Sequence, residues 1–158
     1  MLKRHKGKKI VHVDGLAASI ASVIALAGDE VVIPKYANFM IHNPLCVLWD
    51  AYNANDLRKV INALDGCKES ILNIYMENVK EGITREELSN LMDEETWFTG
   101  DEAQEYFNIT VEESEEIAAC DSNFFNKYRN TPKVLKENEE KENHLDCKKI
   151  AEDRKSVV

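Results

Sequence analysis

A serine near the start of the chain stands where a nucleophile can be activated. Ser19 follows a β-branched run at residues 10–14 and the glycine Gly15, and it lies in the first turn of an expected helix. Unpaired backbone N–H groups and a partial positive charge gather at a helix start, and both stabilise an oxyanion. The alternative is an ordinary packing serine among alanines, because the segment lacks the Gly-x-Ser-x-Gly pattern of a nucleophile elbow.

His42 is the candidate general base. It ends a strand expected at residues 38–42, which should lie parallel to the strand before Ser19, and such strands bring their carboxyl ends to one sheet edge. A neutral imidazole there could take the serine proton and return it to a leaving amine. A histidine before a proline can equally be structural. The other histidines, His5, His12 and His144, are expected on exposed ends or within a sheet.

A catalytic triad also needs a carboxylate that holds the histidine tautomer. Asp93, Glu94 and Glu95 all precede Trp97 in a stretch that we expect to be extended. Alternation in such a stretch would put Asp93 and Glu95 on one face and Glu94 on the other. Spacing alone leaves all three open.

The elements that would position these residues are those of an α/β domain. Residues 10–14 and 31–33 are predicted strands, and the small apolar residues 17–27, stopped by Gly28, predict a buried helix between them. Together they predict a βαβ unit.

Helices dominate the middle of the chain. Apolar residues at three- and four-residue steps predict a long amphipathic helix at 55–78, interrupted at Gly66. Two capping boxes, Thr84-x-x-Glu87 and Thr99-x-x-Glu102, predict helices that run to Met92 and to about Tyr106. The domain is expected at 1–120, and the polar, charged residues 121–158 are expected to be a disordered or loosely helical tail.

Composition excludes several classes of function. The formal charge of −9 argues against a nucleic-acid-binding surface, and the basic residues near the start are read as a solvated helix end. The four cysteines are scattered without zinc spacing, so we expect reduced thiols in a cytoplasm and neither a metal nor a cofactor. No run approaches the roughly 18 apolar residues of a membrane span.

Three segments, taken together, resemble the ClpP-like serine peptidase family. Residues 15–22 read Gly-Leu-Ala-Ala-Ser-Ile-Ala-Ser, like the family's nucleophile segment, and residues 39–44 read Phe-Met-Ile-His-Asn-Pro, like its histidine segment. Residues 95–103 read Glu-Thr-Trp-Phe-Thr-Gly-Asp-Glu-Ala, like the stretch that carries the acid, and Glu-Thr-Trp is typical of the phage branch. The resemblance covers about residues 2–119.

The resemblance implies a crotonase-like (ClpP) fold of stacked ββα/βαβ turns and a ring-shaped homo-oligomer. It also implies an endopeptidase in which Ser19 attacks, His42 relays the proton, Glu95 orients His42 and the N–H of Ile20 binds the oxyanion. Asp93 is the reserve candidate for the acid. Protein and peptide substrates are expected, capsid or scaffold proteins in the case of a phage head-maturation protease. An ATP-driven unfoldase is a further possible partner.

The chain departs from the family pattern at two places. The family has an earlier strand and a Pro-Gly-Gly loop, whose N–H contributes to the oxyanion hole, before a helix that here ends at Gly7. We therefore expect the domain to be N-terminally incomplete. The second departure is Phe107, where the family has a glycine that favours a turn with positive φ.

Two other functions remain as alternatives. One is a catalytically silent subunit or assembly module of the same fold, suggested by the missing Pro-Gly-Gly loop. The other is a crotonase-fold enzyme acting on acyl-CoA thioesters, which the order of Ser19 and His42 disfavours.

Overall fold

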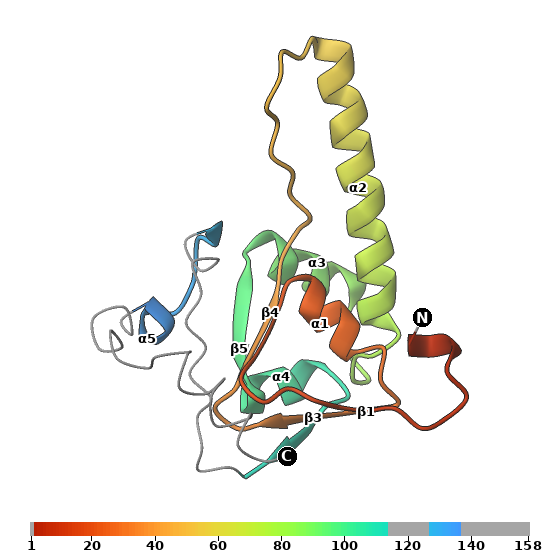
Figure 1. The fold of residues 1–158 in the computed structure, drawn as a ribbon, viewed down its shortest axis with the longest axis vertical. Coiled ribbons are helices and arrows are strands. Elements are labelled where there is room, and N and C mark those ends of the chain that lie inside the picture. The colour runs from red at the N-terminus through yellow and green to blue at the C-terminus, as the bar shows by residue number, and fades with distance from the viewer. Residues whose placement is uncertain (1, 114–126, 137–158) are drawn as a thin grey trace, which may run out of the picture. The chain divides into compact units, whose positions relative to one another are not determined.

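The computed structural model describes residues 2–113 and 127–136. The chain divides into two compact units, residues 1–119 and 120–158. Within the second unit the structure describes residues 127–136, which include the short helix α5 (Lys133–Lys136), and the other residues of the predicted tail, 121–126 and 137–158, lie outside the described residues. The first unit is mixed α/β, with two small sheets and the helices packed around them (Figure 1).

Each sheet of the first unit has three strands. One sheet has the order β1 (Ile10–His12), β3 (Glu30–Pro34) and β6 (Thr110–Glu112), all parallel. The other has the order β2 (Leu16–Ala18), β4 (Asn38–Ile41) and β5 (Thr96–Thr99), with β2 parallel and β5 antiparallel to β4. Helix α1 (Ile20–Ala25) lies between β1 and β3 in the chain, so the predicted βαβ unit is confirmed.

The helix predicted over residues 17–27 is wrong at its start. Leu16, Ala17 and Ala18 form β2, and α1 begins only at Ile20. The reason is tertiary: β2 pairs with β4 in the register Ala18↔Met40, a partner far along the chain. Small apolar residues fit a buried strand and a buried helix equally well, so the pattern could not show the boundary. The strand that runs parallel to β4 is therefore β2 rather than β1.

The remaining helices follow their caps. Helix α2 (Ala54–Met76) begins after Asn53, whose side chain accepts two backbone N–H groups, and it continues through Gly66 without the predicted interruption. Helix α3 (Arg85–Asp93) begins after Thr84, and α4 (Gly100–Tyr106) has the complete capping box of Thr99 and Glu102. A single exposed glycine costs a helix about 1 kcal/mol, too little to break one that is anchored by packing.

Aromatic residues from distant parts of the chain form the centre of the core. The ring of Phe107 lies 5.3 Å from that of Phe39 and 5.8 Å from that of Tyr75, measured between centroids. Phe107 has a φ of −114°, so the turn with positive φ that a glycine would favour is not formed here. The side chain instead fills the space between β4 and α2, where it is fully buried.

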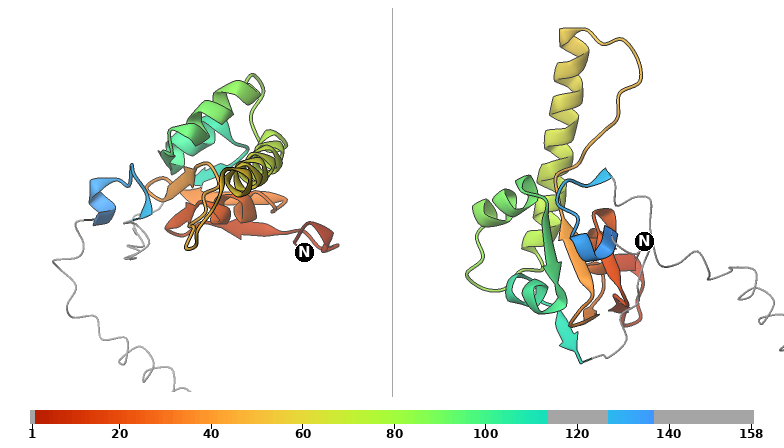
Figure 2. Two further views of the ribbon diagram at one scale, coloured as in Figure 1. Left: turned by 90° about the horizontal axis from the view of Figure 1, so that it is seen from above. Right: turned by 90° about the vertical axis from the view of Figure 1, so that its left-hand side faces the viewer.

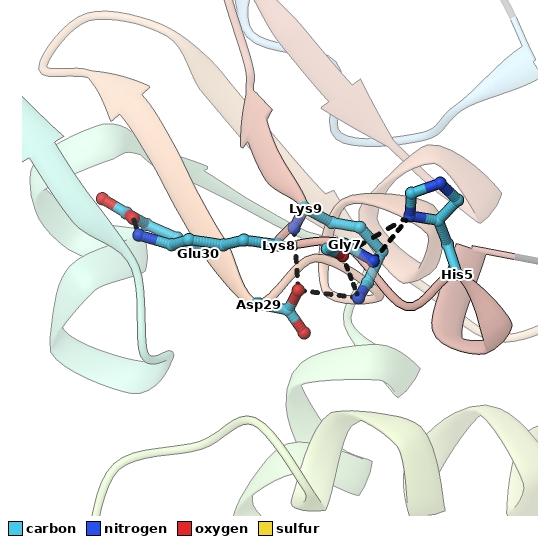
Figure 3. A network of polar contacts seen from close by, with 6 residues as sticks. All are labelled: His5, Gly7, Lys8, Lys9, Asp29 and Glu30. Carbon is cyan, nitrogen blue, oxygen red and sulfur yellow. Dashed lines mark hydrogen bonds and ion pairs between the residues drawn. The ribbon is translucent and has the colours of Figure 1, made fainter.

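Basic residues near the start of the chain form ion pairs with acidic residues near the start of β3. The helix end predicted there is a single 3₁₀ turn, η1 (Leu2–Arg4). Lys8 pairs with Glu30, and Lys9 pairs with Asp29, at 2.6 Å each (Figure 3). Asp29 lies in the turn before β3 and Glu30 is the first residue of β3, so these contacts join the segment before β1 to the strand that pairs with β1.

The first half of α2 stands clear of both sheets (Figure 2), and the segment between β4 and α2 runs alongside it. We call residues 44–65 the arm. Trp49 in the arm is 90% exposed, and the other exposed large apolar side chains of the arm are Leu45, Val47, Leu48, Tyr52, Leu57 and Ile61. Among residues 2–113 and 127–136, no helix has the length and apolar character needed to cross a bilayer.

Candidate functional site

The register of the second sheet brings Ser19 and His42 together. Strand β2 ends at Ala18 and the parallel strand β4 ends at Ile41, so the next residue of each strand emerges at the same edge. The backbone N–H of Ser19 continues the ladder by donating to the carbonyl of Met40 at 3.0 Å. The Oγ of Ser19 lies 2.7 Å from the Nε2 of His42, a hydrogen bond through which the serine proton can pass to the imidazole.

Ser19 adopts a backbone conformation that sequence reasoning missed. Its φ of 59° and ψ of −125° are rare for a residue with a side chain, and conformations of this kind cost about 1–3 kcal/mol. The residue is the N-cap of α1, yet its side chain caps none of the N–H groups in the first turn. The sharp bend between β2 and α1 instead directs the hydroxyl to His42. Only the proximity of strand end and helix start in the sequence hinted at such a turn.

Burial and charge act on His42 in opposite directions. The imidazole is half-buried, and this desolvation lowers the pKa of His42 below its ordinary value of 6.5. The negative charge of Glu95 raises the pKa but is the smaller effect. At neutral pH the ring is therefore mainly uncharged, the form that can accept a proton.

The three acidic residues do not lie in an extended stretch, so the alternation predicted for them is wrong. Asp93 ends α3, Glu94 follows with helical φ and ψ, and Glu95 has a φ of 54° in the turn before β5. The Oε1 of Glu95 accepts a hydrogen bond of 3.4 Å from the indole N–H of Trp97. Glu95 is also the carboxylate whose charge acts on His42.

Asp93 is held by two other partners. Lys68 of α2 donates to its Oδ1 at 2.6 Å, and the side-chain amide of Asn43 donates to the same oxygen at 2.5 Å. Both contacts lower the pKa of Asp93. The N–H of Asn43 also donates to the carbonyl of Met92. Asp93 thus fastens the backbone directly after His42 to α3 and α2.

The described residues contain no group of three or more metal-binding side chains. Cys46 and Cys67 are free thiols on the exposed arm and on α2, and the other two cysteines lie outside the described part of the chain.

Comparison with known proteins defines the class of this chain. Its residues 1–109 match the Clp protease family, so the chain belongs to that family. It is also 33% identical over 97 residues to a protein named ATP-dependent Clp protease proteolytic subunit 1, from Chlamydia abortus (strain DSM 27085 / S26/3). That match covers 60% of this chain and 49% of the relative, so the chain spans about half the length of the curated relative it matches.

Proposed function

We propose that the protein is a serine endopeptidase in which Ser19 is the nucleophile and His42 the general base. The observation that carries the proposal is the 2.7 Å hydrogen bond between Ser19 Oγ and His42 Nε2 in a chain of the Clp protease family. His42 takes the hydroxyl proton as Oγ attacks the scissile carbonyl, and it then gives that proton to the leaving amine. Water hydrolyses the resulting ester by the same steps.

The N–H of Ile20 is the proposed oxyanion donor. It follows the nucleophile directly and lies at the positive end of α1, where the backbone N–H groups have no cap from Ser19. Loss of a single oxyanion donor typically costs about 10²- to 10³-fold in kcat.

Glu95 is the proposed acid of the triad. Its charge acts on His42, whereas Asp93 already has Lys68 and Asn43 as partners. Removal of a triad acid typically lowers kcat by about 10⁴-fold. We expect Glu95→Gln to do so in a folded protein and Glu94→Gln to have little effect. A near-normal Glu95→Gln enzyme beside a severely impaired Asp93→Asn enzyme would move the role to Asp93.

Peptide hydrolysis tests the activity itself. The chain is incubated with a library of fluorogenic peptides and with an unfolded protein such as casein. The expected result is turnover that disappears in Ser19→Ala and persists in Ser89→Ala, a change at a half-buried serine of α3. A folded, assembled chain without turnover dependent on Ser19 would instead support the alternative function, a catalytically silent assembly subunit.

We further propose a crotonase-like arrangement and a ring-shaped homo-oligomer that acts in the cytoplasm. The apolar, exposed arm supports self-association, since isolated large patches of this kind are usual at interfaces. The name of the Chlamydia relative describes a proteolytic subunit of an ATP-dependent protease, which suggests an ATP-driven unfoldase as a partner for this chain as well. Stimulation of casein turnover by a co-purified ATPase, with no change in peptide turnover, is the expected signature.

Phage head maturation is the proposed biological role. It is supported by the order Glu95, Thr96 and Trp97, which resembles the phage branch of the family. The expected result is defined cleavage of capsid or scaffold proteins from the same genome at a rate above that for casein. Equal, non-specific degradation of both would argue for a general proteolytic role.

A further inference from the structure

A buried polar chain lies behind the proposed nucleophile, and it joins two helices. Ser22 of α1 is fully buried, and its Oγ donates to the carbonyl oxygen of Ser19 at 2.6 Å. The hydroxyl of Tyr75, from α2, lies 2.7 Å from the same Oγ. Because Ser22 uses its proton on the Ser19 carbonyl, the Tyr75 hydroxyl is the donor to Ser22. The order of donation is therefore Tyr75 to Ser22 to Ser19.

The last acceptor in this chain belongs to the peptide that carries the oxyanion donor. The bond between Ser19 and Ile20 is trans, so its carbonyl and its N–H point in opposite directions within one plane. A donor that fixes the Ser19 carbonyl therefore also fixes the direction of the Ile20 N–H. The backbone N–H of Ser22 donates to the same carbonyl at 3.0 Å, and the Ser22 hydroxyl makes the shorter contact.

Orientation matters here because the Ser19 backbone is strained. With a φ of 59°, this residue can relax by rotating the peptide that follows it, and such a rotation would turn the Ile20 N–H away from the oxyanion. Hydrogen-bonded chains also polarise one another, so donation into the carbonyl makes the N–H of the same peptide a stronger donor.

Tyr75 is suited to act as a fixed donor. Its ring packs edge-on against Phe107 in the core, at 5.8 Å between centroids. Burial raises the pKa of Tyr75 to about 12, so the hydroxyl keeps its proton across the range in which a peptidase works.

We propose that Ser22 and Tyr75 are positioning residues that hold the peptide between Ser19 and Ile20 in the orientation needed for oxyanion binding. The inference rests on the proposed role of Ser19 as nucleophile. It assigns the two residues a function in catalysis beyond their place in the core, and it links the body of α2 to the chemical step.

The experiment measures how fast a fluorophosphonate modifies Ser19, because the phosphonyl oxygen takes the place of the oxyanion. Saturation kinetics separate binding of the probe from the chemical step. We expect Ser22→Ala to slow the chemical step by about tenfold or more. The effect should be smaller than that of removing a whole oxyanion donor, because the backbone N–H of Ser22 still holds the Ser19 carbonyl. Tyr75→Phe should slow it less, and probe binding should change little in either variant.

A double variant tests the order of the chain. Because Tyr75 acts through Ser22, Ser22→Ala with Tyr75→Phe should react no more slowly than Ser22→Ala alone. The matched controls are Tyr106→Phe, at a partly buried tyrosine that packs against the core, and Ser70→Ala, at a serine of α2 that also donates to a backbone carbonyl. Both should react at the wild-type rate.

The outcomes separate the inference from the proposed function. A wild-type chain that is modified at Ser19, beside folded Ser22→Ala and Tyr75→Phe variants that react equally fast, would overturn the inference and leave the nucleophile in place. A folded wild-type chain that the probe does not modify would overturn both. All rates are measured at a temperature well below the unfolding midpoint of each variant. Every variant is then folded, and a loss of stability does not change the measured rate of Ser19 modification.

Discussion

Ser19 joins a strand to a helix in a single residue, and its left-handed backbone is what this bend requires. The same φ of 59° would suit glycine better, because glycine has no Cβ to clash with the backbone. A side chain is nevertheless present, and its hydroxyl lies 2.7 Å from His42. Strain kept at a position whose side chain meets a histidine is typical of a functional site.

The strain predicts an ordering of stability among inactive variants. Ser19→Gly should be more stable than Ser19→Ala by roughly 1 kcal/mol, because only glycine relaxes at this φ. Urea unfolding of both variants measures the difference, and neither should hydrolyse peptides. Equal stabilities, or a more stable alanine variant, would show that the backbone at Ser19 is not strained.

The electrostatics of His42 predict the pH dependence of hydrolysis. Since burial lowers the pKa of His42, the acid limb of kcat/KM should have its midpoint below pH 6.5, with full activity at neutral pH. Glu95 raises that pKa, so Glu95→Gln should move the midpoint to still lower pH while kcat falls. A midpoint that moves upward in Glu95→Gln would contradict the interaction between these two residues.

At the scale of helices and strands, the space around each glycine decides whether a larger residue can replace it. A Cβ on Gly100, at the start of α4, would lie 2.3 Å from the carbonyl oxygen of Pro34 in β3. Gly66, within α2, has no atom within 4 Å of its Cβ position. Gly100 therefore lets the start of α4 lie close to the end of β3. Gly66 has no neighbour that would limit its side chain.

These two glycines form a matched pair. Gly100→Ala should destabilise the protein by about 1–3 kcal/mol, because backbone must move to admit the methyl group. Gly66→Ala should stabilise it by up to about 1 kcal/mol through helix propensity. Chemical unfolding monitored by tryptophan fluorescence measures both, and a neutral Gly100→Ala variant would contradict the close packing of α4 on β3.

The helices and strands also show which parts of the fold could be predicted from the sequence. Caps and periodicity predicted α2, α3 and α4, because these signals are local and belong to the helix itself. The helix predicted at 17–27 includes Ala17 and Ala18 of β2, because the identity of this strand depends on its pairing with β4, more than 20 residues away. The turn at Glu95 was missed for a similar reason, as nothing in its neighbours marks a left-handed residue.

The candidate site likewise contains residues that the sequence predicted and residues that only the structure brings together. Ser19 and His42 were predicted as partners from the ends of two strands, and the structure brings their side chains into contact. The roles of Ser22 and Tyr75 had no signal in the sequence. They lie 53 residues apart, and only the packing of α1 against α2 makes them neighbours.

At the scale of the whole molecule, the arm is the segment whose exposed apolar side chains suit a contact with another chain. Trp49 and Ile61 are exposed there, and we expect them to contact a second copy of the chain in the proposed ring assembly. Trp49→Glu and Ile61→Glu should therefore lower the assembly mass measured by light scattering. Asn90→Glu adds the same charge at a polar, exposed position of α3, outside the arm, and should leave the mass unchanged. An equal mass for all variants would exclude the arm from the assembly contact.

The most direct test of the proposed serine peptidase is the site of covalent modification by a fluorophosphonate. The full chain is treated with the probe and digested, and the adduct is located by mass spectrometry. We predict a single adduct on Ser19 that is absent after unfolding, absent in Ser19→Ala and much slower in His42→Asn. A folded chain in which Ser19 stays unmodified, or is modified equally fast without His42, would contradict the account.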